Sequence, residues 1–281
     1  MTPYHPYTLN AATYHIRLTG YTVSIYSLTP DPRPPPRCPT PVLCTITALA
    51  LATQIVLLGT GDPTALSRRA GPATAIVVDG RAYLVDFGPG VIRRVAAAHE
   101  KGIAALDPVN LTHAFATQLQ FDHTAGYPEL VFTPPELGRK QPLEVYGPPG
   151  IRRLTEHILA AWNDGVQVNA HEIAPGLAYR DDKITVIAFG GGYRFQTADR
   201  TIVIRGDPSP SEAIVKQCNG CDVLIHEVRA QSVRQLSELA ARARPELLIL
   251  HSHHSNENEL MRQIGNVYRG RFVIGHDLDV Y

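Results

Sequence analysis

The stretch ATQLQFDHTAGY, residues 116–127, follows a predicted strand and carries an adjacent Asp122 and His123. A carboxylate and an imidazole that lie close together in a strand-end loop are suited to hold a metal ion. The two positions that should reach back toward them, Gln118 and Gln120, are both glutamine, whose neutral carbonyl oxygen is a much poorer zinc ligand than imidazole. The segment therefore has the spacing of a metal-binding loop from which two ligands have been lost.

Strands and helices alternate in two runs around this stretch. Before it come an apolar strand from Gln54, a hairpin that turns at Asp79-Gly80, and an amphipathic helix that ends at Gly102. After it, strands are predicted in LEVYG (143–147), KITVIAF (183–189), YRFQT (193–197), TIVIR (201–205), DVLIHE (222–227), LLILH (247–251) and RFVIG (271–275), with helices between most of them. This pattern predicts two facing mixed sheets with outer helices rather than one doubly wound sheet.

Eight segments in this order resemble the metallo-β-lactamase superfamily, in its branch of ribonuclease-Z-like and arylsulfatase-like hydrolases. They are LLGTGDP (57–63), GPATAIVVDGRAYLVDFGPG (71–90), TQLQFDHTAGY (117–127), LEVYGPPG (143–150), TIVIRGD (201–207), CDVLIHE (221–227), LLILH (247–251) and DLDVY (277–281). The resemblance covers residues 54–281. It implies an α/β fold, an αβ/βα four-layer sandwich, with one or two metal ions at one edge.

The resemblance also implies where the first metal ion should be held. In the family pattern T-H-x-H-x-D-H, Thr117, Asp122 and His123 match, whereas Gln118 and Gln120 replace the two histidines of the first metal. The third histidine should follow the strand 183–189, but AFGGGYRF (188–195) runs straight into the next strand. All three histidines of the first metal are therefore missing, and restoring the two at 118 and 120 should recover metal binding only in part.

The second metal position keeps more of its ligands. Asp207 matches the bridging carboxylate, and the last ligand is His251, His253 or His254, with His251 and His253 favoured. With Asp122 and His123 these residues are predicted to converge on one ion at most, which is zinc, or else iron or manganese. Asp122 and Asp207 are also the predicted catalytic carboxylates, and Asp86 and His226 the predicted supports of the ligands.

The resulting functional hypothesis is a metal-dependent hydrolase that acts on a small sulfate, phosphate or carboxylic ester. The alternative is a catalytically inactive pseudoenzyme that keeps the fold as a binding or scaffold module; a degraded gene is a third. Lys plus Arg and Asp plus Glu both number 26, so no net charge attracts a polyanion. We therefore expect a small-molecule ester as partner, no nucleic acid and no stable membrane span, and we leave a homodimer open.

The N-terminal part differs from the rest. Residues 1–41 are rich in proline and lack apolar periodicity, so a disordered extension is predicted there. Residues 42–52, VLCTITALALA, resemble the apolar part of a secretory signal, although a buried first strand is an alternative. The chain is accordingly divided into 1–41, 42–52 and a domain at 53–281, secreted or periplasmic if the signal acts and cytoplasmic otherwise. The CNGC sequence at 218–221 has structural, disulfide and redox interpretations.

Overall fold

The computed structural model describes residues 13–18, 21–26, 52–61, 67–162, 165–207, 209, 211–228, 232–252 and 257–281. The chain divides into two compact units, Met1–Ala48 and Leu49–Tyr281. In the first unit, β1 (Thr13–Leu18) and β2 (Tyr21–Tyr26) form an antiparallel hairpin, an element that the sequence analysis did not predict. Except for Ala52, the signal-like segment lies outside the described residues.

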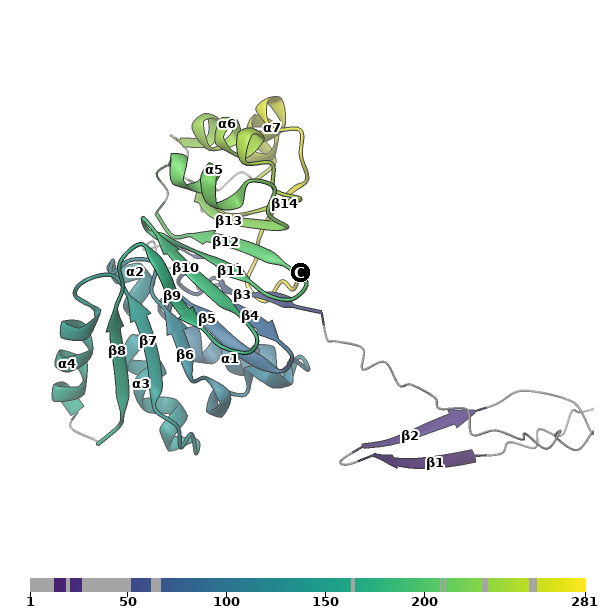
Figure 1. Cartoon of the computed structure of the whole chain (residues 1–281), viewed down its shortest axis with the longest axis vertical. Coiled ribbons are helices and arrows are strands. Elements are labelled where there is room, and N and C mark those ends of the chain that lie inside the picture. Colours follow the sequence, from purple (N-terminus) through teal and green to yellow (C-terminus); the bar gives the residue numbers. More distant parts are fainter. Residues whose placement is uncertain are drawn as a thin grey trace, which may run out of the picture. The chain divides into compact units, whose positions relative to one another are not determined.

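The second unit contains two mixed sheets, as predicted (Figure 1). The first has the order β3 (Gln54–Gly59), β4 (Ala73–Val78), β5 (Arg81–Val85), β6 (His113–Phe115), β7 (Leu143–Gly147), β8 (Val168–Glu172). The second has the order β15 (Phe272–Ile274), β14 (Leu247–Ser252), β13 (Val223–Val228), β12 (Thr201–Arg205), β11 (Gly192–Gln196), β10 (Thr185–Phe189), β9 (Gly176–Arg180). Each sheet has an antiparallel part and a parallel part. The parallel strands are β5 to β8 in the first sheet and β12 to β15 in the second.

Helices cover the outer face of each sheet, because parallel strands need crossover connections. On the first sheet they are α1 (Val91–Glu100), α3 (Tyr127–Glu136) and α4 (Ile151–Trp162), with 3-10 turns at Ala104–Leu106 and Pro108–Asn110. On the second sheet they are α5 (Glu212–Cys218), α6 (Val233–Ala243) and α7 (Glu257–Val267). The predicted four-layer αβ/βα sandwich is thus confirmed.

Three apolar clusters hold these layers together. One lies between the two sheets and includes Ile76, Phe115 and Ile225, and the other two lie between each sheet and its helices. Alternating side chains along each strand supply both faces, since successive residues point to opposite sides. The sheets are therefore apolar on both faces, and polar residues collect where the strands end.

Two features complete the fold around the site. Cys218 and Cys221 form a disulfide between the end of α5 and the start of β13, so that of the three interpretations of CNGC the structure contains the disulfide. A short helix, α2 (Phe121–Thr124), carries Asp122 and His123 and follows β6 after the loop 116–120. In the described part of the chain, no helix is long and apolar enough to cross a membrane.

Candidate active site

Asp86 organises the strand ends of the first sheet. It follows β5 with a left-handed φ of 58°, which an aspartate tolerates better than most residues. Its buried carboxylate accepts hydrogen bonds from the backbone N–H of Thr117 at 2.7 Å and from His123 Nδ1 at 2.9 Å. The Thr117 hydroxyl also donates to it, at 2.8 Å. Asp86 therefore fixes both the loop after β6 and the orientation of the His123 ring.

His123 presents its second nitrogen to two carboxylates. Its Nε2 lies 3.8 Å from Asp122 Oδ2 and 3.9 Å from Glu227 Oε2, and it has no hydrogen-bond partner among the described residues. Burial alone would lower the pKa of His123, but the carboxylates of Asp86, Asp122 and Glu227 outweigh it and raise the pKa. The surroundings of Nε2 therefore favour a positive charge there, either a proton or a cation.

The two glutamines occupy different environments. Gln118 is partly buried and its Nε2 donates to the Gly206 carbonyl at 3.1 Å, which ties the loop after β6 to the end of β12. Gln120 is exposed and precedes α2 without making a side-chain cap. Of the two positions from which histidines are missing, only 118 thus has a contact to the second sheet among the described residues.

Asp207 is engaged by a neighbouring arginine. Arg205 NH2 lies 2.8 Å from Asp207 Oδ2, and its Nε donates to the Asp207 backbone carbonyl at 3.2 Å. Arg205 NH1 donates to the Gly190 carbonyl, in the shortened loop between β10 and β11. Burial alone would raise the pKa of Asp207, but hydrogen bonds from the Ser209 backbone N–H and hydroxyl and the charge of Arg205 lower it. The predicted bridging carboxylate is therefore already paired with a cation.

Two of the predicted histidines, His226 and His251, lie in the second sheet. His226 is fully buried in β13, its Nδ1 contacts the Glu227 backbone carbonyl, and burial lowers its pKa to about 4. His251, at the end of β14, lines a cavity of about 20 Å³ together with Asp86, His123, Arg205, Gly206, Glu227 and seven further residues. His253 and His254 lie outside the described residues. The choice between His251 and His253 as last ligand stays a prediction.

These residues do not fit a two-metal centre. Within the described ranges, no group of three His, Cys, Asp or Glu side chains is arranged to hold a metal ion. The Asp207 carboxylate is bound to Arg205, and the convergence of Asp122, His123 and Asp207 on one ion stays a prediction. The cavity beside His123 has room for about one water-sized species. Among the described residues, the arrangement around Nε2 thus offers room for one small species and no preformed set of ligands for a metal ion.

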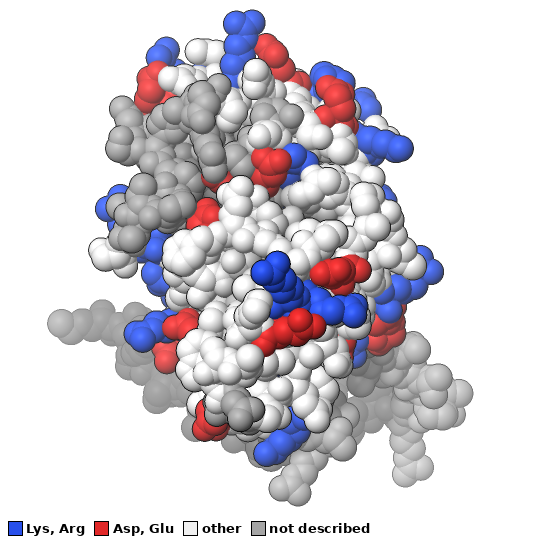
Figure 2. All heavy atoms as spheres, turned by 90° about the vertical axis from the view of Figure 1, so that its left-hand side faces the viewer, with Lys and Arg blue, Asp and Glu red and all other residues white. Residues whose placement is uncertain are grey.

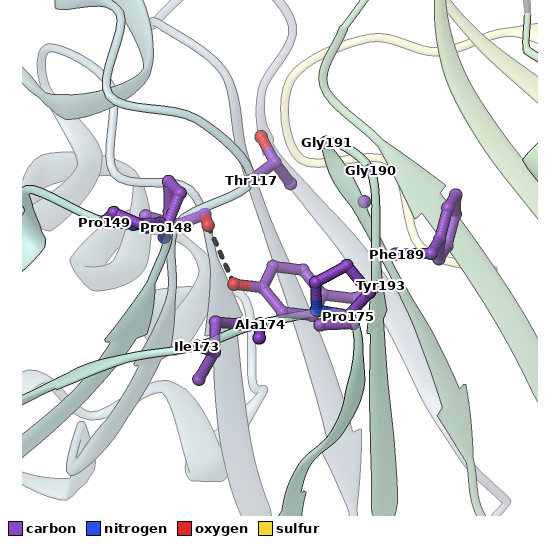
Figure 3. Close-up of a pocket in the computed structure, with 13 residues that line it drawn as sticks. Thr117, Pro148, Pro149, Ile173, Ala174, Pro175, Phe189, Gly190, Gly191 and Tyr193 are labelled. Carbon is purple, nitrogen blue, oxygen red and sulfur yellow. Dashed lines mark hydrogen bonds between the residues drawn. The ribbon is translucent and has the colours of Figure 1, made fainter.

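A second cavity opens beside the first, at the same strand ends (Figure 3). It has a volume of about 160 Å³ and is mostly apolar, and its lining comes from four loops and strand ends: Ala116, Thr117, Pro148, Pro149, Ile173–Pro175 and Ala188–Tyr193. The Tyr193 hydroxyl donates to the Ala116 carbonyl at 2.8 Å, which fixes the ring as one wall. Thr117 lines this cavity and also contacts Asp86, so the two cavities are neighbours.

Comparison with known proteins identifies the family. Residues 81–276 match the sequence profile of the β-lactamase superfamily domain. The chain belongs to the metallo-β-lactamase superfamily. It is 31% identical over 252 residues to a protein named ribonuclease Z from Mycobacterium sp. strain KMS, which covers 80% of this chain and 84% of the relative. A ribonuclease Z from Mycobacterium bovis BCG Pasteur is 28% identical over 250 residues, with 79% and 85% covered.

Solved structures of other superfamily members share the fold. The Bacillus subtilis protein YhfI superposes with a TM-score of 0.68 at 16% identity, covering 82% of this chain and 98% of that one. The short form of human tRNase Z gives a TM-score of 0.64 at 23% identity, with 81% and 98% covered. This metallo-β-lactamase-fold chain therefore lies in the ribonuclease-Z-like branch, as its motifs predicted, in a superfamily whose members generally bind zinc.

The relatives contradict two predictions about the substrate. A small sulfate, phosphate or carboxylic ester as substrate, and the exclusion of nucleic acid as partner, are both wrong for a chain whose relatives are ribonucleases. The error came from the charge count, since equal numbers of acidic and basic residues describe the whole chain and not one site. Figure 2 shows both signs interspersed on the face that it presents, without a uniform field.

Sequence reasoning missed the part played by Arg205 and Glu227. Arg205 is a charged residue at the end of an otherwise apolar strand, which is itself a signal, because buried arginines are rare unless paired. Glu227 ends the run DVLIHE and faces the same cavity as His123. Neither the Arg205–Gly190 contact nor the approach of Glu227 to His123 could be inferred from spacing alone, since each joins residues far apart in the sequence.

Proposed function

We propose that this metallo-β-lactamase-fold chain acts on phosphodiester bonds of RNA. The proposal is supported by the relatives named ribonuclease Z, which align with four fifths of the chain. In the structure, the observation that carries it is the buried His123 side chain, whose Nε2 lies near the carboxylates of Asp122 and Glu227 at the strand ends. Such a group of side chains can hold and move protons at a reacting bond.

Proton transfer is the step for which these residues are placed. Cleavage of a phosphodiester needs a proton for the leaving oxygen and an acceptor for the proton of the attacking water. The raised pKa of His123 makes the imidazolium the donor, and a neighbouring carboxylate, Asp122 or Glu227, the acceptor. Asp86 holds the ring in this orientation through Nδ1. Zinc is the metal expected if a cation takes the place of the proton, with one ion at most.

The apolar cavity supplies a place for the part of RNA next to the phosphate. A cavity of about 150 Å³ in another protein holds one benzene ring, so the volume of about 160 Å³ here suits a single flat ring. Nucleobases bind to aromatic and apolar walls by stacking, which contributes about 1–3 kcal/mol per base. Tyr193, Phe189 and the three prolines of the lining form such walls. We assign this cavity to a nucleobase adjacent to the bond that is cleaved.

Two variants separate the roles of the two cavities. His123→Ala removes the proton-transfer group, and Gly190→Leu fills the apolar cavity, since no atom lies within 4 Å of a Cβ built on Gly190. With a tRNA transcript that carries single-stranded ends, we expect His123→Ala to abolish cleavage and keep binding. Gly190→Leu should weaken binding about tenfold, as loss of one stacked base would. His157→Ala, on the exposed side of α4, is the matched control and should behave as the parent.

The measurement is a filter-binding and cleavage assay at stated salt concentrations, because binding to phosphates depends strongly on salt. A bis-aryl phosphate, tested in parallel, separates general phosphodiester hydrolysis from action on RNA. A parent chain that neither binds nor cleaves the transcript would contradict the proposal. Equal cleavage by the parent and His123→Ala would show that RNA is processed elsewhere on the molecule.

A further inference from the structure

Arg205 is a buried cation at the end of β12, next to residues that the family motif assigns to the first metal ion. Its side chain is 7% exposed, although an arginine in a soluble protein is rarely buried without a specific partner. Its three nitrogens contact the Asp207 carboxylate, the Asp207 backbone carbonyl and the Gly190 carbonyl. The guanidinium is thereby held in one orientation from two sides.

The groups around Arg205 occupy the positions that the family motif gives to first-metal ligands. Asp207 is the bridging position, and Gly190 belongs to the loop that should have carried the third histidine. Gln118, at the position of the first histidine, contacts Gly206, the residue between Arg205 and Asp207. Two of the four first-metal positions therefore contact this side chain, and a third, Gln118, contacts the residue next to it.

The packing leaves little room for a separate ion. Gly191 has a φ of +71°, and a Cβ built on it would lie 3.3 Å from Asp207 Cβ and 3.8 Å from Arg205 NH1. A Cβ on Gly206 would lie 2.1 Å from Thr117 Oγ1, so the ends of β6 and β12 are in direct contact. The shortened loop thus packs onto the ion pair.

The charges also disfavour a separate metal ion beside Asp207. A carboxylate that is partly withdrawn from water needs a positive partner, which a metal ion provides in a two-metal centre and a guanidinium provides here. A divalent ion placed against Asp207 would in addition be repelled by Arg205. The cavity of about 20 Å³ beside His123 is lined by Arg205 as well as by the carboxylates of Asp86 and Glu227, so the guanidinium also contributes a positive charge to its wall.

We propose that the guanidinium of Arg205 is a built-in cation that replaces the first metal ion of the family's centre. The site then has at most one exchangeable cation, at His123. Returning histidines to positions 118 and 120 does not by itself create a second metal site, because Arg205 still neutralises Asp207. The proposal concerns the site of the proposed function, but it holds whether or not RNA is the substrate.

Zinc content of a set of variants tests this. After chelation and re-addition of zinc, the parent and Gln118→His/Gln120→His should each bind no more than one equivalent. Adding Arg205→Ser to the double variant should bring about one further equivalent and a larger rise of the melting temperature with zinc. Adding Arg205→Lys should bring none, since the charge is kept. Arg200→Ser, at the residue that directly precedes β12, is the matched control and should leave the double variant unchanged.

Two results would overturn the proposal. One is a second equivalent of zinc in Gln118→His/Gln120→His with Arg205 in place; the other is no gain in a folded variant that lacks Arg205. Should Arg205→Ser fail to fold, zinc-soaked crystals of the parent decide: an anomalous peak between Gln118 and Asp207 refutes the proposal, and a peak confined to His123 supports it. Because metal content is the readout, these outcomes are distinguishable from a failure of the RNA assays.

Discussion

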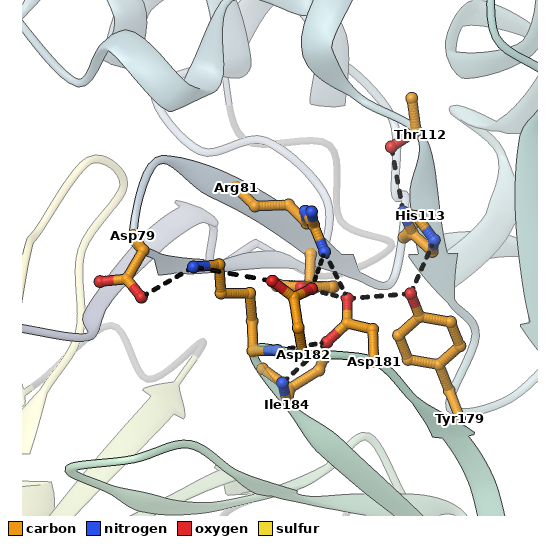
Figure 4. A network of polar contacts seen from close by, with 10 residues as sticks. Asp79, Arg81, Thr112, His113, Tyr179, Asp181, Asp182 and Ile184 are labelled. Atoms are coloured by element: carbon orange, nitrogen blue, oxygen red, sulfur yellow. Dashed lines mark hydrogen bonds and ion pairs between the residues drawn. The ribbon is translucent and has the colours of Figure 1, made fainter.

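Both ends of the two-sheet sandwich carry histidine and aspartate side chains, but the two ends differ in how completely these side chains are hydrogen-bonded. At the start of β5 and β6, the carboxylate of Asp181 accepts hydrogen bonds from Arg81 NH1 at 2.7 Å, Tyr83 at 2.6 Å and Tyr179 at 3.0 Å. Both nitrogens of His113 are also bonded, to Thr112 and Tyr179 (Figure 4). This network joins the two sheets and leaves none of its buried side-chain atoms unpaired.

At the other end of the same strands, His123 Nε2 is buried and unpaired among the described residues. A buried polar atom without a partner costs about 1–3 kcal/mol, so such an atom in a native site calls for an explanation. The comparison suggests one. The Asp181 network stabilises the sandwich, whereas the His123 end keeps a donor atom available for a ligand at the expense of stability.

The largest expected effect is at the stabilising end. Asp181→Asn removes a carboxylate that accepts three side-chain and two backbone hydrogen bonds, so the free energy of unfolding should fall by about 2–3 kcal/mol. RNA cleavage at a temperature well below the transition should stay at the parental level. Urea unfolding at pH 7 measures the free energy of unfolding. An unchanged midpoint would show that the Asp181 network does not stabilise the sandwich.

The pH dependence of that effect has a definite sign. Burial alone would raise the pKa of Asp181, but the hydrogen bonds from Tyr83, Ile184 and Lys183 lower it to about 2. A carboxyl with a depressed folded-state pKa contributes stability above its unfolded pKa of about 3.9 and loses it as the pH falls through the folded value. The difference between the parent and Asp181→Asn should therefore be full at pH 6 and shrink toward pH 2.

An intermediate effect is expected for Asp86→Asn. Asparagine tolerates the left-handed φ and keeps the size of the side chain, but it removes the charge that faces His123. The pKa of His123 should fall, cleavage should drop by at least tenfold, and the free energy of unfolding should change by about 1 kcal/mol. Imidazole NMR and the RNA assay check this together. A large loss of stability with no change in the His123 pKa would show that Asp86 stabilises the fold, as Asp181 does, and does not act through His123.

The smallest effect is expected at the N-terminus. Thr53 donates to Asp199 from its backbone N–H at 2.9 Å and from its hydroxyl at 2.5 Å, so the second unit is anchored from this residue onward. A chain that begins at Thr53 should unfold within about 0.5 kcal/mol of the full chain. Calorimetry of the two proteins measures this, and a markedly lower melting temperature would show that the upstream residues contribute to the core.

The fold was predictable because its signal is distributed along the chain. Apolar runs such as 54–58 and 201–205 and the helix at 151–162 each carry their own periodicity, and their order limits the topology. The role of Asp86 was also accessible from its motif. The Arg205 contact was not, because it depends on the β11–β12 register, in which Gly192 lies opposite Arg205 and brings the preceding turn across the guanidinium. The substrate class was missed because the total numbers of acidic and basic residues do not show where on the surface the charges lie.

The most direct test of the contrast between the two ends is an imidazole NMR spectrum of the parent chain, recorded during titration with a short RNA oligonucleotide and, separately, with zinc. The resonances of His123 should shift with each ligand, because its buried Nε2 has no hydrogen-bond partner among the described residues and lies near the carboxylates of Asp122 and Glu227. Those of His113, bonded at both nitrogens in the Asp181 network, should stay in place. Shifts confined to His113, or none at His123 with either ligand at saturation, would contradict the account.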